Sequence, residues 1–232
     1  MFKQNFWQFF QSFLSFLKHR LVRHRTSLLL LLLGVFLPLQ IFGELAEDIW
    51  ENEGGFSWDV PILLAIHQIA NPKLDILVVF LTKLGVFWGV VPVAVAIALM
   101  LLLRRQWYWL TYFLVTLLGS TLINRTAKVL LHRVRPHLWQ SPAPEFDYGF
   151  PSGHAMASMT LITALTIMTW DTRWRWWVMG FGGLLVLLIG WTRLYLGVHY
   201  PSDVLAGWMA SIAWGIGVRL LLKPKHSKMP QI

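Results

Sequence analysis

Six long apolar runs constrain this chain more than any other feature of its sequence. They lie at approximately residues 27–43, 85–103, 107–123, 155–170, 176–192 and 204–222. Each run has about 16 to 19 residues, close to the length that a helix needs to cross the hydrocarbon core of a bilayer. We therefore predict an all-α fold, an integral membrane bundle of six transmembrane helices.

Composition supports this prediction and argues against several other classes. Hydrophobic residues make up 56% of the 232 residues and charged residues only 13%, against about 25% charged residues in a typical soluble domain. The net charge of +9 would suit nucleic acid, but the basic residues sit at the ends of apolar runs and form no solvated stripe. We expect no nucleic-acid partner. Without cysteine, the chain has neither disulfides nor thiolate metal sites.

Residues 1–26 are predicted to form an amphipathic, basic segment on the cytoplasmic side. Phe6, Phe10, Phe13 and Leu17 recur at helical spacing with polar residues between them, which is typical of an interfacial helix. A cleaved signal peptide is the alternative, but the basic residues come late and no clear small-residue cleavage site follows. The six-span domain is expected to cover residues 27–225, and a tail to cover residues 226–232.

The stretch at residues 60–84 is less regular than the six runs. Its apolar positions share one face, but polar residues and Pro72 interrupt it. We predict short helices here that lie on the membrane or dip into it.

The charged residues orient the predicted spans. Most Lys and Arg flank the span ends that share a side with the N-terminus, and six acidic residues between positions 44 and 59 fall on the other side. Basic loops stay cytoplasmic. We therefore expect a multi-pass protein of the inner or plasma membrane with both termini in the cytoplasm.

Three short polar clusters adjoin the apolar runs. They are Lys128 with Arg135-Pro136, then Pro151-Ser152-Gly153-His154, then Arg193 with His199 and Asp203. With six spans, the third and fifth end on the side where the fourth and sixth begin, so all three clusters share the periplasmic or extracellular face. Ionisable groups at a membrane boundary are costly and usually functional. The clusters therefore indicate a single site.

The residue types in these clusters suit a phosphate group. The three cations can hold an anion through charge-assisted hydrogen bonds. Ser152 and Gly153 open the fourth span, where free N–H groups and the helix dipole also favour an anion. His199 paired with Asp203 suits nucleophilic attack or proton transfer.

At these clusters the chain resembles the type 2 phosphatidic acid phosphatases, also called the lipid phosphate phosphatase and vanadium haloperoxidase superfamily. The family pattern is a Lys, six residues and Arg-Pro, then Pro-Ser-Gly-His, then Ser-Arg, five residues, a His, three residues and an Asp. The chain matches this pattern over residues 128–207, except that Thr192 stands where Ser is usual. Thr192 keeps a hydroxyl, so we expect little functional loss.

The resemblance implies a metal-independent lipid phosphatase without a cofactor. His199 would attack phosphorus and form a phosphohistidine, Asp203 would orient its ring, and His154 would protonate the leaving oxygen and then activate water. The phosphate-binding residues would be Lys128, Arg135, Ser152, Gly153 and Arg193. The substrate would be a phosphomonoester or diphosphate of a lipid in the bilayer, such as phosphatidic acid, phosphatidylglycerol phosphate or undecaprenyl diphosphate.

Two alternatives remain open at this point. Haloperoxidases of the superfamily hold vanadate in a similar pocket, so an oxidoreductase is one alternative, although those enzymes are soluble. A transporter that binds a metal through His154, His199, Asp203 and His137 is the other, although three nearby cations disfavour a metal cation. The oligomeric state is open.

The other polar residues near the clusters have plainer predicted roles. Arg125 and Arg133 are expected to contact phospholipid headgroups, with substrate binding beside Lys128 as the alternative for either. Glu145 and Asp147 are expected to lie in a solvated loop before the fourth span.

Overall fold

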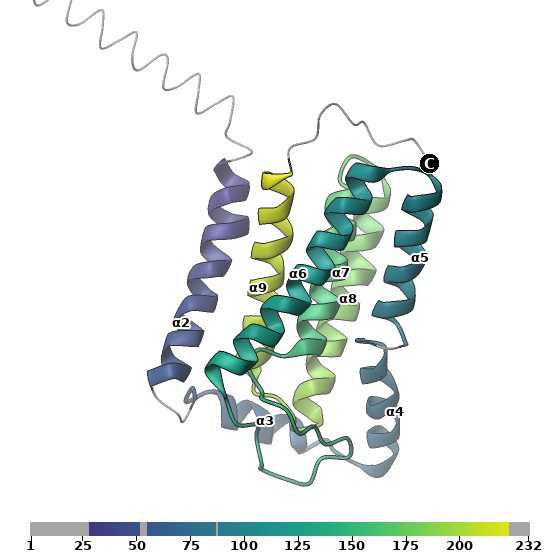
Figure 1. Ribbon diagram of the computed structural model, residues 1–232. Coiled ribbons are helices and arrows are strands. Elements are labelled where there is room, and N and C mark those ends of the chain that lie inside the picture. Colours follow the sequence, from purple (N-terminus) through teal and green to yellow (C-terminus); the bar gives the residue numbers. More distant parts are fainter. Residues whose placement is uncertain (1–27, 52–54, 87, 223–232) are drawn as a thin grey trace, which may run out of the picture.

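The computed structural model describes residues 28–51, 55–86 and 88–222. Every regular element within these ranges is a helix (Figure 1), which confirms the predicted all-α class. The elements are a π-helical turn η1 (Leu32–Phe36), α2 (Leu37–Glu51), α3 (Asp59–His67), α4 (Pro72–Lys83), α5 (Val90–Leu103), α6 (Trp107–Leu131), α7 (Gly153–Met168), α8 (Trp174–Tyr195) and α9 (Pro201–Leu221). The predicted interfacial helix at residues 1–26 lies outside the described residues.

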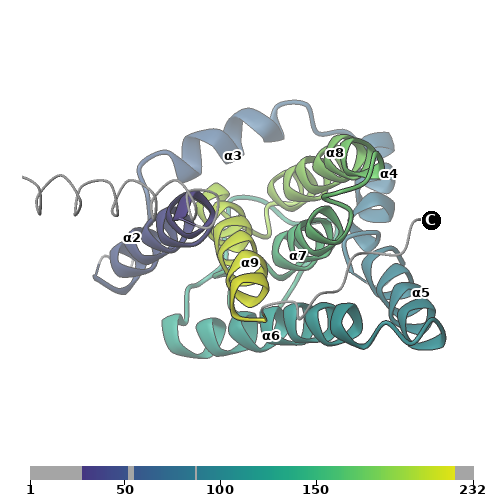
Figure 2. The same ribbon diagram turned by 90° about the horizontal axis from the view of Figure 1, so that it is seen from above.

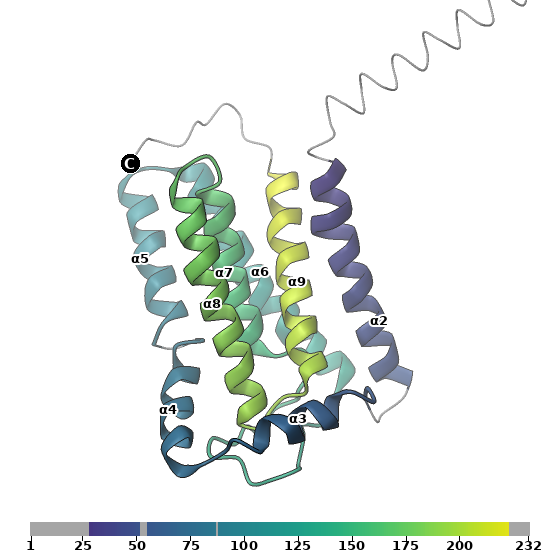
Figure 3. The same ribbon diagram turned by 180° about the vertical axis from the view of Figure 1, so that it is seen from behind.

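Four helices in the described part of the chain are long and apolar enough to cross a membrane. They are the continuous run Leu28–Glu51, which contains η1 and α2, and the helices α6, α8 and α9. The helices α5 and α7 are apolar but shorter. Each predicted span therefore overlaps a helix, and these helices run side by side in two opposite views (Figures 1 and 3).

The helix α7 lies at the centre of the bundle, with α5, α6, α8 and α9 packed around it (Figure 2). Its buried positions carry small and hydroxylated residues as well as apolar ones. The hydroxyls of Ser120 on α6 and Thr160 on α7 share a hydrogen bond of 2.7 Å. Small side chains let neighbouring helices approach closely, which is how helices pack without a hydrophobic driving force in lipid.

Residues 60–84 form short helices, as predicted. The helix α3 runs across one end of the bundle, and α4 stands beside α8 (Figure 3). Asn71 caps α4 by accepting the Leu74 N–H at 3.0 Å. Tyr195 at the end of α8 donates to Asp75 at 2.7 Å. This contact fixes α4 against the bundle at the end where the polar clusters lie.

Candidate active site

Four helix ends meet where α3 crosses the bundle, and they form the candidate site. The helices α6 and α8 end there, and α7 and α9 begin there, so the structure brings the three predicted clusters together. Gly207 on α9 contributes to this convergence. A Cβ atom at Gly207 would lie 3.0 Å from the carbonyl oxygen of Ser152, so glycine lets α9 approach the start of α7.

His199 and Asp203 form the predicted pair. His199 is buried in the short loop between α8 and α9. Its Nδ1 lies 3.3 Å from Asp203 Oδ2, the same oxygen that accepts the Tyr200 backbone N–H at 2.8 Å. Because Asp203 accepts a hydrogen bond from Nδ1–H, the lone pair of the neutral ring is on Nε2. Burial and two nearby arginines hold the pKa of His199 well below its usual range, and Arg135 Nη1 donates a hydrogen bond of 2.8 Å to this Nε2 lone pair.

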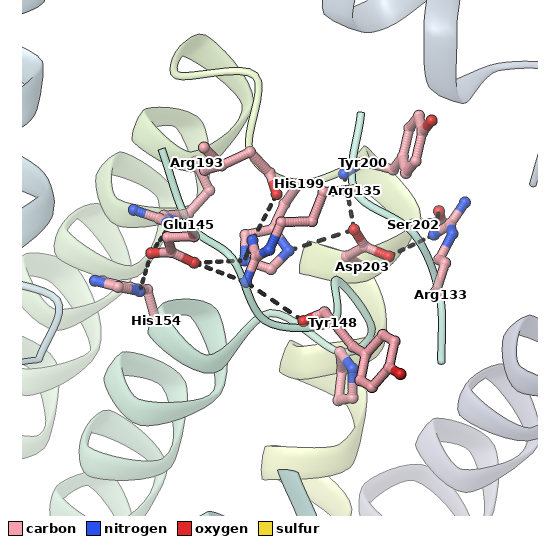
Figure 4. Close-up of polar contacts among 12 residues, drawn as sticks. Arg133, Arg135, Glu145, Tyr148, His154, Arg193, His199, Tyr200, Ser202 and Asp203 are labelled. Atoms are coloured by element: carbon pink, nitrogen blue, oxygen red, sulfur yellow. Dashed lines mark hydrogen bonds and ion pairs between the residues drawn. The ribbon is translucent and has the colours of Figure 1, made fainter. Parts of the chain in front are cut away.

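Two buried arginines converge on the Glu145 carboxylate (Figure 4). Arg193 contacts Oε1, and Arg135 Nη2 lies 2.7 Å from Oε2. The same carboxylate lies 3.8 Å from His154 Nδ1 and 3.7 Å from His199 Nε2. A carboxylate presents negative oxygens as a phosphate does. Glu145 therefore occupies the position between the two histidines where the family resemblance predicts the phosphoryl group.

A second loop acid, Asp147, pairs with the third cation. Lys128 Nζ donates to Asp147 Oδ2 at 2.6 Å and to the Tyr148 carbonyl at 2.7 Å. Arg135 also contacts the Asp147 side chain and donates from Nε to its carbonyl at 2.7 Å. Burial by itself raises the pKa of Asp147, but Lys128 and Arg135 lower it to about 2. Burial by itself also raises the pKa of Glu145, but the surrounding positive charges, Arg193 first among them, lower it to about 2.

The Pro-Ser-Gly-His stretch leads into α7 beside these charged groups. The Ser152 N–H donates to the Asp203 carbonyl at 3.0 Å, so this N–H is already paired. The Ser152 hydroxyl is buried without a partner among the described residues, so the hydroxyl is its available donor. Gly153 is the first residue of α7, where the N–H has no partner within the helix.

Arg193 depends on α4 for its position. Its Nη1 donates to the Thr82 hydroxyl at 2.7 Å, and its Nε is buried without a partner in the described ranges. The neighbouring Thr192 hydroxyl donates to the Ile189 carbonyl at 2.7 Å within α8. The hydroxyl at position 192 therefore bonds to the backbone of its own helix, and a Ser hydroxyl could make the same bond.

The sequence profile of the PAP2 superfamily matches residues 109–226. The chain belongs to the PAP2 superfamily. It is 30% identical over 184 residues to an undecaprenyl-diphosphatase from Sulfolobus acidocaldarius, which covers 77% of this chain and 84% of the relative. It is 32% identical over 161 residues to phosphatidylglycerophosphatase B from Bacillus subtilis, which covers 65% and 76%.

A solved structure agrees with this membership. The crystal structure of a transmembrane PAP2-type phosphatidylglycerolphosphate phosphatase from Bacillus subtilis superposes with a TM-score of 0.68 at 28% identity. The match covers 78% of this chain and 94% of that chain. The predicted family is thus confirmed, and with it the class of integral membrane phosphatase.

Two predictions for polar residues of this PAP2 chain are wrong. Arg133 does not face lipid headgroups, because it is buried and contacts Asp59 and Asp203. Glu145 does not lie in solvent, because its side chain is only 28% exposed and holds two arginines. The one sequence feature that could have pointed to a role for Glu145 was its position between two clusters of basic residues. Asp59 had no signal at all.

Replacing Glu145 with Gln is expected to tighten the binding of orthovanadate roughly tenfold or more, because like charges placed together cost on the order of several kcal/mol. The Glu145 carboxyl has a pKa of about 2, so it stays ionised at any pH used for the assay. Lowering the pH therefore does not neutralise this carboxylate, and the substitution is needed to remove its charge. The measurement is the vanadate inhibition constant of detergent-purified protein. Glu47→Gln, on an exposed site of α2, is the matched control. Unchanged or weaker inhibition of Glu145→Gln would show that the carboxylate does not compete with the anion.

Proposed function

We propose that this protein releases phosphate from a lipid phosphomonoester or diphosphate through a phosphohistidine on His199. One observation carries the proposal: the Glu145 carboxylate lies between His154 and His199, held by Arg135 and Arg193. It marks the position at which a substrate oxyanion would lie within reach of both imidazoles.

The proposed reaction has two steps. His199 Nε2 attacks phosphorus while the bond from phosphorus to the lipid oxygen breaks, and His154 gives that oxygen a proton. Water then attacks the phosphohistidine, His154 takes a proton from the water, and His199 leaves. Asp203 accepts the Nδ1–H throughout and stabilises the positive ring. The phosphate oxygens are held by Lys128, Arg135, Ser152, Gly153 and Arg193, and substrate takes the place of the Glu145 carboxylate.

The relatives suggest which lipids to consider. One acts on undecaprenyl diphosphate and another on phosphatidylglycerol phosphate by their names. These two lipids and phosphatidic acid are the proposed candidates for this chain. All three present a terminal phosphoryl group on a hydrocarbon anchor, which a site at the end of a membrane bundle can receive from the bilayer.

The function is tested with purified full-length protein in detergent and a panel of these three lipids. Phosphate release should persist in excess chelator and be inhibited by vanadate, which mimics the trigonal bipyramidal transition state. Loss of activity in chelator, restored by zinc or magnesium, would refute the metal-free mechanism. Halide oxidation by peroxide with vanadate present, without phosphate release, would instead support the oxidoreductase.

We also propose the membrane arrangement. Residues 27–225 form the six-span domain, residues 1–26 form a basic interfacial segment on the cytoplasmic side of the membrane, and residues 226–232 form a cytoplasmic tail. The active site then opens at the outer face of the inner or plasma membrane. The basic flanks of the spans support this orientation.

This arrangement predicts which introduced cysteines react from outside intact cells. Gln140 is exposed in the loop between α6 and α7, at the site end, and Asp171 is exposed in the turn between α7 and α8, at the other end. Gln140→Cys should react with an impermeant maleimide in intact cells, and Asp171→Cys only after lysis. The chain has no native cysteine, so the background is low. The reverse pattern of labelling would place the site on the cytoplasmic face.

A further inference from the structure

Arg133 stands at the centre of a buried ionic network behind His199. Its Nη1 contacts Asp203 Oδ1 and donates to the Ser202 hydroxyl at 2.7 Å. Its Nη2 lies 2.7 Å from Asp59 Oδ2. The guanidinium carbon also lies 4.4 Å from the centre of the Tyr200 ring. One guanidinium therefore joins two carboxylates. One of them, Asp203, holds the ring of His199 (Figure 4).

Asp59 reaches this network from the first turn of α3, far from the family's motifs in sequence. Its Oδ1 accepts the Ser202 N–H at 3.0 Å, and its Oδ2 accepts the Ser202 hydroxyl at 2.6 Å. The Asp59 side chain is 2% exposed. A buried carboxylate with this set of partners is held in one position, and its charge is little screened by solvent.

The charges of the network matter because His199 becomes positive in the proposed reaction. When Nε2 bonds to phosphorus, the imidazole still carries its Nδ1–H and gains positive charge, which Asp203 stabilises. Arg133 on the other side of Asp203 offsets that stabilisation. Asp59 on the far side of Arg133 restores it, since two carboxylates and one guanidinium leave one net negative charge behind the ring.

We propose that Asp59 and Arg133 are positioning residues that set the basicity of His199 through Asp203. The inference rests on the proposed role of His199 as nucleophile. Arg133 fixes the plane of the Asp203 carboxylate, and Asp59 supplies the charge that keeps Asp203 an effective partner for a positive ring. Neither residue needs to touch substrate.

Other charged or titratable groups also face His199, and they are the same in the variants compared below. They are Lys128 from α6, Arg135 and Glu145 from the α6–α7 loop, His154 from α7 and Arg193 from α8.

The inference predicts opposite effects of Asp59→Asn on the two chemical steps. A less basic imidazole is a poorer nucleophile but a better leaving group. Formation of the phosphoenzyme should therefore slow and its hydrolysis should speed up. The rate of formation divided by the rate of hydrolysis should fall several-fold, up to about tenfold, for each pKa unit that His199 loses. Rapid-quench labelling with a ³²P-labelled lipid phosphate measures formation, and a chase with unlabelled substrate measures hydrolysis.

Asp75→Asn is the matched control. Asp75 also belongs to the segment between the first two predicted spans and fixes it to the bundle through Tyr195, but it is not part of the Asp203 network. A merely structural role of Asp59 predicts that both variants slow both steps together. Asp59→Glu, which keeps the charge, should return the ratio of rates toward that of the wild type.

Failure of the proposed function and failure of this inference would give different experimental results. If the wild type forms no phosphoenzyme, the proposed function fails. If the wild type forms it but Asp59→Asn leaves the ratio of the two rates unchanged, the inference is overturned and the proposed function stands. Should Asp59→Asn not yield folded protein, Asp59→Ser offers a second neutral replacement whose hydroxyl can accept the Ser202 N–H, with the same expected split.

Discussion

Replacing His199 with Ala is expected to abolish phosphate release and all covalent labelling. The loss should be on the order of 10⁶-fold, the scale seen when a catalytic nucleophile is removed. His199 is buried, its Nδ1 is committed to Asp203, and its Nε2 lies beside the carboxylate that marks the anion position. Rapid-quench labelling with a ³²P-substrate should show an acid-labile, base-stable adduct in the wild type and none in His199→Ala.

A second histidine on the same end of the bundle serves as the control. His137 is exposed in the α6–α7 loop, and His137→Ala should keep both turnover and label. Asp203→Asn should slow formation of the adduct, because the amide cannot hold the ring in the required tautomer as the carboxylate does. Full labelling of His199→Ala would remove this residue from the role of nucleophile.

Replacing His154 with Ala is expected to cost about 10² to 10⁴ in rate, the usual contribution of general acid–base catalysis. His154 lies in the first turn of α7 and faces the anion position from the side opposite His199. The loss should be much smaller for p-nitrophenyl phosphate if the pocket admits it, because nitrophenolate leaves without a proton. The measurement compares kcat/KM for a lipid phosphate and for p-nitrophenyl phosphate in both proteins.

Comparing the lipid phosphate with p-nitrophenyl phosphate distinguishes a role of His154 as general acid from a structural role. A His154→Ala protein that has lost its local structure should lose both activities alike. An adduct retained in His199→Ala but lost in His154→Ala would exchange the roles of the two histidines.

Local sequence properties determined most of the fold. Length and apolarity are features of a continuous stretch, so the six runs were found where the helices lie, and residues 60–84 were separable as short helices. The motif residues could also be predicted, because they adjoin the ends of the predicted spans. Counting the spans then puts those ends on the same side of the membrane. Lys128, His154, Arg193 and His199 were predicted to share one site from the sequence, and the structure brings them together.

Only the tertiary structure decided what surrounds those residues. Glu145 looked like an ordinary loop acid, Arg133 like a headgroup contact and Asp59 like one of several outer-face acids. Their roles depend on ion pairs between segments far apart in the chain, and the energy of an ion pair is set by separation and burial, neither of which is a property of a local stretch. The sequence thus determined which groups are proposed to do the chemistry, and the packing of α3, α4 and the α6–α7 loop decided which charges surround them.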